Sequence, residues 1–144
     1  MKKMDVHIVG LGNLGSAFLN GLKGLDANIF LYEESNEVRQ SIQKNYSISP
    51  EESLTAIRGG VLLLCIKPQN INDFFDNHID KIENEVLICS PVAGLEINTI
   101  EKYFGNNILR IMPNLLIRDK NGFIPYASNY QGDYLNFIQN ILEN

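Results

Sequence analysis

The sequence is poor in the residue types that carry metal, disulfide and nucleic-acid chemistry. It has two cysteines and two histidines in 144 residues, and its 17 acidic residues outnumber 12 basic ones, for a net charge of −5. Proteins that bind nucleic acid rely on clustered Lys and Arg, so this charge argues against that class. No apolar run approaches the roughly 20 residues that a membrane-spanning helix needs. We therefore expect one globular domain with a small-molecule partner, and neither nucleic acid nor a membrane.

The cysteines and histidines are also poorly placed for a metal site. Cys65 and Cys89 lie far apart, each in an apolar, strand-like run, which predicts core thiols in a reducing compartment. His7 lies inside the first apolar run, and His78 lies on an expected polar helix face. Neither has a sequence neighbour that would complete a nucleophilic pair. We therefore expect a cytoplasmic protein without a metal ion, and hydrolysis or group transfer has little support.

What the sequence does contain is a glycine motif near its start. The apolar run Val6–Val9 leads into Gly10, Gly12 and Gly15, spaced G-x-G-x-x-G, and a helical pattern follows at once. In dinucleotide-binding folds the first glycine permits a tight turn, the second admits a pyrophosphate, and the third lets helix and strand pack closely. The helix N-terminus offers free N–H groups to the phosphates. The motif therefore predicts a dinucleotide site.

Strand and helix patterns alternate along the chain, which is typical of βαβ units and a parallel sheet. The expected strands are residues 5–9, 28–32, 46–48, 61–66, 85–89, 107–111 and 123–127. The expected helices are residues 13–23, 36–45, 49–58, 71–82, 97–104 and 134–142. Ser49 as N-cap, Pro50 in the first turn and Glu52 in a capping box predict the third helix. The predicted fold is α/β, a Rossmann-type doubly wound, mainly parallel sheet with helices on both faces, spanning residues 1–144.

Polar, glycine and proline residues follow the expected strands where open parallel sheets bind ligands, outside the carboxyl ends. These segments are residues 10–15, 33–34, 67–69, 90–94 and 112–114. Ordinary turns use the same residue types, which is the alternative interpretation. Because the glycine motif lies at the same edge, we expect a cofactor crevice there. Lys67 has three open roles in it: contact with a phosphate, with the nicotinamide carboxamide, or with solvent alone.

Glu33 is the candidate ligand for the adenosine ribose. It lies 23 positions after Gly10, close to the offset of about 20 residues for the acid that binds the ribose hydroxyls. A carboxylate there also repels the 2′-phosphate of NADP. The nearest arginine, Arg39, is six positions away. These features favour NAD(H) over NADP(H), with Glu34 as a solvated neighbour; the alternative is that both acids form a solvated turn.

Four segments carry a more specific pattern, namely Val6–Ala17, Leu63–Gln69, Ser90–Leu95 and Leu109–Asn114. Together they resemble the pyrroline-5-carboxylate reductase family, through Lys-Pro-Gln, Ala-Gly and Met-Pro-Asn elements in the order of that family. The resemblance implies an oxidoreductase of proline biosynthesis that reduces 1-pyrroline-5-carboxylate, an imine, to L-proline with NAD(P)H. Hydride transfer requires few catalytic side chains, because the cofactor carries the chemistry and the protein positions it.

The resemblance also implies which residues hold the cofactor. In the family, the segments that match Gly10–Leu14, Cys65–Pro68 and Pro91–Ala93 hold the dinucleotide, and the position of Asn114 lies near nicotinamide and substrate. The full expected set is Gly10, Leu11, Gly12, Asn13, Leu14, Gly15, Glu33, Cys65, Ile66, Lys67, Pro68, Val92, Ala93, Gly94 and Asn114. No catalytic residue is assigned beyond the position of Asn114.

Two departures from the family pattern keep other functions open. Leu115 and Leu116 follow Met-Pro-Asn where the family has Thr-Pro, which favours a dehydrogenase of the same fold with another substrate. The family's C-terminal helical domain, which dimerises and supplies most of the substrate site, is expected to be absent from this chain. This domain alone is then inactive, or it is a non-catalytic, NAD-binding regulatory domain. The residues leave a homo-oligomer open.

Overall fold

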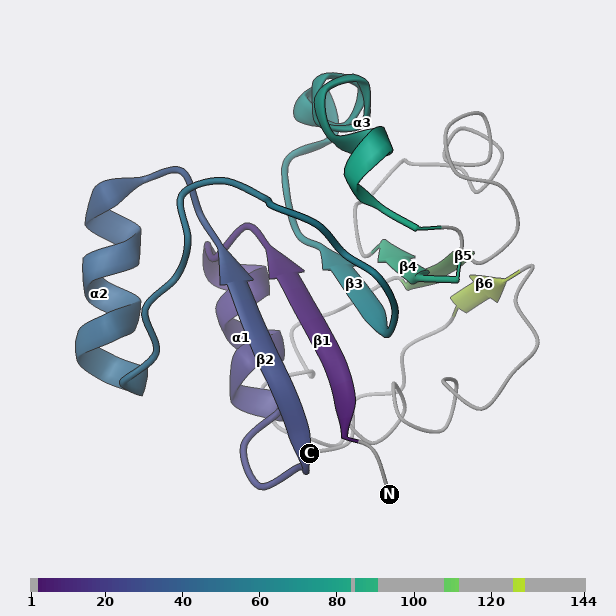
Figure 1. Cartoon of the computed structure of the whole chain (residues 1–144). Coiled ribbons are helices and arrows are strands. Elements are labelled where there is room, and N and C mark those ends of the chain that lie inside the picture. Colours follow the sequence, from purple (N-terminus) through teal and green to yellow (C-terminus); the bar gives the residue numbers. More distant parts are fainter. Residues whose placement is uncertain (1–2, 84, 91–107, 112–125, 129–144) are drawn as a thin grey trace.

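A sheet with the strand order β2-β1-β3-β4-β5-β6 forms the centre of the molecule (Figure 1). The computed structural model describes residues 3–83, 85–90, 108–111 and 126–128. The strands are β1 (Met4–Val9), β2 (Ala27–Tyr32), β3 (Val61–Leu64), β4 (Leu87–Ser90), β5 (Ile108–Ile111) and β6 (Tyr126–Ser128). Strands β1 to β5 run parallel, and β6 pairs with β5 in the antiparallel direction.

Three described α-helices cover the sheet, α1 (Asn13–Gly21), α2 (Asn36–Tyr46) and α3 (Ile71–His78). Short 3-10 helices precede and follow α3, η1 (Pro68–Asn70) and η2 (Ile79–Lys81). Helices α1 and α2 lie on one side of the sheet and α3 on the other (Figure 1). No helix within the described ranges is long and apolar enough to cross a bilayer.

The central strand β3 explains why both faces need a cover. Side chains alternate between the faces of a strand, so Val61 and Leu63 enter one core cluster while Leu62 and Leu64 enter the other. All four are fully buried, and each such burial stabilises the fold by about 1.5–3 kcal/mol. The helical members are Phe18, Leu19 and Ile42 on the first face and Ile71, Phe74 and Phe75 on the second. The predicted fold class is confirmed.

Helix α2 begins and ends with recognisable signals. The hydroxyl of Ser35, the N-cap, accepts a hydrogen bond from the amide of Val38 at 3.3 Å. Ser47, in the left-handed conformation with φ of 58°, donates its amide to the carbonyl of Gln43 and ends the helix. Ile42 points into the core, and the helix runs one residue beyond the predicted 36–45.

The segment after α2 contains neither the predicted strand 46–48 nor the predicted helix 49–58. Both predictions are wrong. Tyr46 is the last residue of α2 and Ser47 ends that helix, while the backbone at Glu51 pairs with the end of β2. The amide of Glu51 donates to the carbonyl of Leu31 at 2.8 Å, and the amide of Glu33 donates to the carbonyl of Glu51 at 2.9 Å. This makes an isolated parallel bridge where a capping pattern indicated a helix, so tertiary pairing overrides a local preference.

The same segment reaches the core farther along. Leu54 and Ile57 join the cluster that α3 covers, and Ile57 forms a second isolated bridge with Ile82. Residues 47–60 therefore form an extended segment that starts beside β2 and is held by a bridge at Glu51, to Tyr32, and by another at Ile57, to Ile82. The predicted helix 71–82 is divided into α3 and η2, while the predicted helices 97–104 and 134–142 lie outside the described residues.

Candidate functional site

Two of the three glycines are required by close backbone contacts. Gly10 has a φ of +92°, and a Cβ on it would lie 2.6 Å from the carbonyl oxygen of Cys65, at the end of β3. Its amide donates to the carbonyl of Tyr32 at 2.9 Å, which joins the turn to β2. A Cβ on Gly15 would collide with the carbonyl oxygen of Gly10. The glycines thus let the first turn of α1 pack against the loop, as the motif predicts.

Gly12 differs from both, because a Cβ built on it meets nothing within 4 Å. It is the N-cap of α1, and no side chain caps the helix. The amides of the first helical turn have no intrahelical acceptors, and the helix dipole gives this end a partial positive charge. Open space at Gly12 beside free amides suits a diphosphate group. The residues present therefore fit the phosphates of a dinucleotide.

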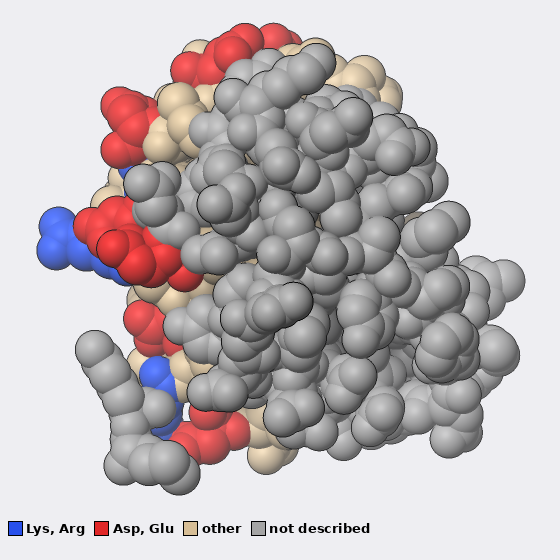
Figure 2. Space-filling view, turned by 90° about the vertical axis from the view of Figure 1, so that its right-hand side faces the viewer, with Lys and Arg blue, Asp and Glu red and all other residues tan. Residues whose placement is uncertain are grey.

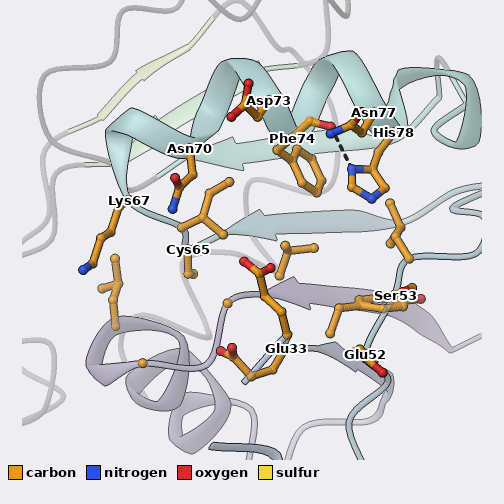
Figure 3. A pocket seen from close by; sticks show the side chains of 18 of the residues that line it. Glu33, Glu52, Ser53, Cys65, Lys67, Asn70, Asp73, Phe74, Asn77 and His78 are labelled. Atoms are coloured by element: carbon orange, nitrogen blue, oxygen red, sulfur yellow. Dashed lines mark hydrogen bonds between the residues drawn. The ribbon is translucent and has the colours of Figure 1, made fainter. Parts of the chain in front are cut away.

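The glycine turn opens into a cavity of about 790 Å³ at the carboxyl ends of β1, β2 and β3 (Figure 3). One wall comes from the glycine turn and α1, a second from residues 52–54, and a third from η1 and α3. The lining residues are Val9, Gly10, Gly12, Asn13, Leu14, Tyr32, Glu33, Glu34, Glu52, Ser53, Leu54, Cys65, Ile66, Lys67, Asn70, Asp73, Phe74, Asn77 and His78. The cavity lies where open parallel sheets bind ligands.

The structure brings together most of the predicted site residues that it describes. The predicted residues that line the cavity are Gly10, Gly12, Asn13, Leu14, Glu33, Cys65, Ile66 and Lys67. Three others lie beside it: Leu11 is buried in the core, Gly15 is buried against the loop, and Pro68 begins η1. The predicted Val92, Ala93, Gly94 and Asn114 lie outside the described residues.

Both carboxylate oxygens of Glu33 accept hydrogen bonds from the backbone. The amide of Leu11, in the glycine turn, donates to Oε1 at 2.8 Å, and the amide of Ser35 donates to Oε2 at 2.9 Å. The carboxylate therefore joins the glycine turn to the start of α2. Each oxygen has a second lone pair, so Glu33 can still accept from the two hydroxyls of a ribose. Its side chain points into the cavity (Figure 3).

Arg39 lies close to Glu33 in space although it is six positions away along the chain. Its Nη1 donates to the backbone carbonyls of Glu33 and Glu34, each at 2.8 Å, and its Nη2 donates to Oδ1 of Asn36 at 3.4 Å. The guanidinium thereby holds the turn between β2 and α2. The separation of six positions does not predict this contact, because it depends on the side chain of Arg39 turning back from α2 toward the end of β2.

The wall that η1 and α3 provide is not among the predicted parts of the site. Its lining residues are Asn70, Asp73, Phe74, Asn77 and His78. Their spacing of i, i+3, i+4, i+7 and i+8 is that of one helix face, so a helical projection of the segment after Lys-Pro-Gln would have found them. Glu52 and Ser53 were missed because their segment was predicted to be helical. The cavity therefore extends beyond the strand ends from which it was predicted, to α3 and residues 52–54.

Charge in the cavity is mostly negative. Glu33, Glu34, Glu52 and Asp73 line it, and Lys67 is the one Lys or Arg among the described lining residues. Burial raises the pKa of the Cys65 thiol far above its usual value, so this lining group stays neutral and is a poor nucleophile. The described residues include no group of three His, Cys, Asp or Glu that could hold a metal ion.

The comparisons with known proteins agree with this geometry. Residues 5–94 match the model of the family described as NADP oxidoreductase coenzyme F420-dependent. The chain belongs to this family. It is 30% identical over 123 residues to pyrroline-5-carboxylate reductase 2 of Bacillus subtilis (strain 168), which covers 79% of this chain and 43% of the relative. Pyrroline-5-carboxylate reductase of Methanosarcina acetivorans is 26% identical over 125 residues, covering 80% of this chain and 46% of the relative.

Solved structures show the same fold. The crystal structure of Plasmodium falciparum pyrroline carboxylate reductase with NADP bound superposes with a TM-score of 0.73 at 22% identity, covering 97% of this chain and 55% of that one. The match to the two curated relatives confirms the resemblance to the pyrroline-5-carboxylate reductase family. This chain spans less than half the length of the two curated relatives named above.

Proposed function

We propose that this chain is the cofactor-binding domain of an NAD(P)H-dependent pyrroline-5-carboxylate reductase. The observation that carries the proposal is the open space at Gly12, which faces a cavity of about 790 Å³ beside the uncapped N-terminus of α1. That combination suits a diphosphate, and the similarity to pyrroline-5-carboxylate reductases supports the imine as substrate. The nicotinamide supplies a hydride to the carbon of the C=N bond when it is bound.

The protein's part in this function is to bind and orient. The amides of the first turn of α1 stabilise the diphosphate. Glu33 accepts hydrogen bonds from the ribose hydroxyls with the lone pairs that Leu11 and Ser35 leave free. Lys67 lies at the opposite end of the cavity from His78 (Figure 3), which suits contact with the diphosphate or the carboxamide. Asn114, at the family's nicotinamide position, remains the proposed contact near the substrate.

We further propose that the domain prefers NAD(H) to NADP(H). Three carboxylates, those of Glu33, Glu34 and Glu52, line the part of the cavity beyond the glycine turn and oppose a 2′-phosphate. The neighbouring cation, Arg39, already donates hydrogen bonds to two backbone carbonyls, which competes with a contact to a 2′-phosphate. Calorimetric titration with NADH and with NADPH tests this preference. Tighter binding of NADPH would contradict it.

The substrate and the full enzyme need a second domain in this proposal. The test fuses this chain to the part of the Bacillus subtilis relative that the match does not cover, and measures reduction of 1-pyrroline-5-carboxylate. Turnover in the fusion, with none in the isolated chain, supports the reductase. Turnover of another imine or ketone would indicate a dehydrogenase of the same fold. NADH binding without turnover of any tested substrate would indicate a regulatory domain.

The proposal extends to the compartment and to other partners. Cys65 and Cys89 are free thiols, and both have partly or fully buried positions, which suits the reducing cytoplasm. Figure 2 shows Asp and Glu side chains gathered along the visible edge of the described part, with few Lys and Arg among them. That distribution supports a small-molecule partner over nucleic acid. Co-purified nucleic acid would contradict it.

A further inference from the structure

The imidazole of His78 has one nitrogen held by its own helix. Its Nδ1 lies 2.8 Å from the carbonyl oxygen of Phe74, one turn earlier in α3. A carbonyl oxygen can only accept, so Nδ1 carries the proton of this hydrogen bond. In the neutral ring Nε2 is then an unprotonated acceptor. The backbone contact thus fixes which nitrogen can accept a hydrogen bond from a ligand.

Nε2 is directed toward the cavity. Figure 3 shows the ring of His78 below α3, with the second nitrogen on the side away from the helix. Within the described part of the chain, the hydrogen bond from Nδ1 is the one that the ring makes. A half-buried acceptor in a binding cavity selects for a ligand group that donates.

The surroundings of this acceptor suit a flat ring. The rings of Phe74 and His78 stack with centroids 4.8 Å apart and an interplanar angle of 27°. Phe74 is itself supported edge-to-face by the fully buried Phe75, at 5.5 Å. Ser53 lies on the facing wall of the cavity, in the extended segment 47–60 (Figure 3). An aromatic wall fixed from behind is a favourable surface for a planar base.

The order of residues along the cavity determines which part of the cofactor reaches His78. Lys67 lies at one end, Glu33 lies in the middle, and His78 and Ser53 lie at the other end (Figure 3). The diphosphate belongs beside the glycine turn and the adenosine ribose beside Glu33, as the proposed function has it. The base attached to that ribose then extends away from Lys67, toward His78.

We propose that His78 recognises the adenine base of the cofactor, with Nε2 accepting a hydrogen bond from the exocyclic 6-amino group. This inference rests on the proposed function, because it needs a dinucleotide in the cavity. In hypoxanthine the 6-position is an oxygen, which would face Nε2 as a second acceptor, and the donor is the N1–H group beside it. The domain therefore favours adenine, whose donor is at the 6-position, over hypoxanthine, whose donor is at N1.

The decisive experiment compares two ligands on the unchanged protein. NADH and the reduced nicotinamide hypoxanthine dinucleotide differ at the 6-position, where the amino group becomes an oxygen, and at the adjacent N1, which gains a proton. Calorimetry gives both affinities. We expect the hypoxanthine analogue to bind about tenfold more weakly, the size of one lost hydrogen bond with two buried polar groups left unpaired. Equal affinities would overturn the assignment of His78 while leaving the proposed function intact, since NADH still binds. Failure of both ligands to bind would instead overturn the proposed function.

Variants of His78 separate recognition from packing. In His78→Gln the amide offers either an acceptor or a donor, so both dinucleotides should bind with similar affinity. The control is Asp76→Asn, on the exposed part of α3, which should keep the discrimination of the unchanged protein. Retained discrimination in His78→Gln would contradict the proposal.

Nitrogen-15 NMR provides a readout that does not depend on affinity. The chain has two histidines, so the His78 signals are assigned by their loss in His78→Gln. In the neutral ring we expect the proton on Nδ1 rather than on Nε2, and a shift of the Nε2 signal with NADH but not with the hypoxanthine analogue. A neutral ring with its proton on Nε2 would overturn the proposal, because that nitrogen could not accept.

Discussion

The amide of Leu11 donates to the carboxylate of Glu33 over 2.8 Å, although the two residues are 22 positions apart. The second carboxylate oxygen accepts from Ser35, so one side chain fixes the glycine turn against the start of α2. Glu33, the proposed ligand of the ribose, is therefore also a structural link between the glycine turn and α2. Affinity and local stability should respond together when this carboxylate changes.

Replacement Glu33→Gln should weaken both roles of the side chain. The new NH2 group cannot accept from a backbone amide, so either Leu11 or Ser35 loses its acceptor. We expect NADH affinity to fall about tenfold, and stability to fall by about 1 kcal/mol, the size of one hydrogen bond at a half-exposed site. The loss of negative charge should narrow the difference between NADH and NADPH. Calorimetry and urea unfolding measure both effects, and Glu37→Gln, exposed in α2, is the control. Unchanged NADH affinity would contradict the ribose role.

Substitution of Gly12 should lower the affinity for the dinucleotide without lowering the stability of the fold. In Gly12→Val the new side chain enters open space beside the helix N-terminus, so the fold remains and the diphosphate is blocked. We expect NADH affinity to fall at least tenfold, about 1.4 kcal/mol, with little change in the melting temperature. Gly59→Val is the matched control, because a Cβ there also meets nothing within 4 Å and lies outside the cavity. NADH binding by Gly12→Val as tight as by the control would refute the diphosphate site.

Gly15→Ala, unlike Gly12→Val, should lower the stability of the fold. A Cβ at this position collides with the carbonyl oxygen of Gly10, so α1 must move away from the loop. We expect a loss of stability of about 1–3 kcal/mol, the usual range for overpacking a well-packed site. Thermal unfolding checks this, and a melting temperature equal to that of the unchanged protein would contradict it.

Arg39→Ala should loosen the turn between β2 and α2. It removes two hydrogen bonds from a charged donor to the carbonyls of Glu33 and Glu34. Because the guanidinium is partly exposed to solvent, we expect a loss of about 1 kcal/mol rather than the full value of a buried charged pair. The variant also removes a cation beside the acidic turn, so NADPH should bind still more weakly. Urea unfolding and NADPH titration measure the two effects; tighter NADPH binding would contradict the second.

His7 should make the fold sensitive to acid. Burial lowers the pKa of His7 from 6.5 to about 4, against the opposing charge of Asp5. Its ring is stacked on Phe30 and its Nδ1 lies 3.3 Å from the hydroxyl of Tyr32. The unfolded chain takes up a proton near pH 6.5 and the folded chain near pH 4. Stability from this group is therefore complete above pH 6.5 and is lost as the pH falls to 4, by about 3 kcal/mol.

The check for His7 is the unfolding free energy in urea across that pH range. His7→Phe keeps a flat ring against Phe30 but cannot titrate, so its stability should change less between pH 6.5 and 4. The difference in slope between the two proteins isolates the histidine, because their carboxylates titrate alike. Equal slopes would show that His7 is protonated at the same pH in both states.

Much of the fold follows from short-range patterns. The runs Val61–Leu64 and Leu87–Ser90 are apolar enough to predict buried strands, and the spacing around Ile42 predicts the inner face of α2. The segment 49–58 could not be predicted in this way, because its conformation depends on hydrogen bonds with the carbonyl of Leu31, in β2, and the amide of Glu33, directly after β2. Local capping signals were present there, but the pairing with a distant strand prevailed.

The site, like the fold, has parts that local sequence patterns predict and parts that depend on tertiary structure. The glycine motif and the acid after β2 were found by spacing, because each lies next to a strand end that the sequence marks. The link between Leu11 and Glu33, and the return of Arg39 to the turn, depend on where side chains lie in three dimensions. His78 was recognised as a residue of a helix but not as part of a binding wall, since the wall exists only after the chain folds.

The extended segment beside β2 has a consequence for how the cavity opens. Its backbone is attached to the neighbouring elements by the bridge of Glu51 with Tyr32 and by that of Ile57 with Ile82, and between them the carbonyl of Leu54 accepts a hydrogen bond from Nζ of Lys81 at 3.3 Å. Residues between these attachments form one wall of the cavity, while the glycine turn is joined to the central strands. Local unfolding requires less free energy than global unfolding where few contacts hold a segment. In hydrogen exchange, the amides of this strip should open well before those of β1, giving a bound base a route out that leaves the sheet closed.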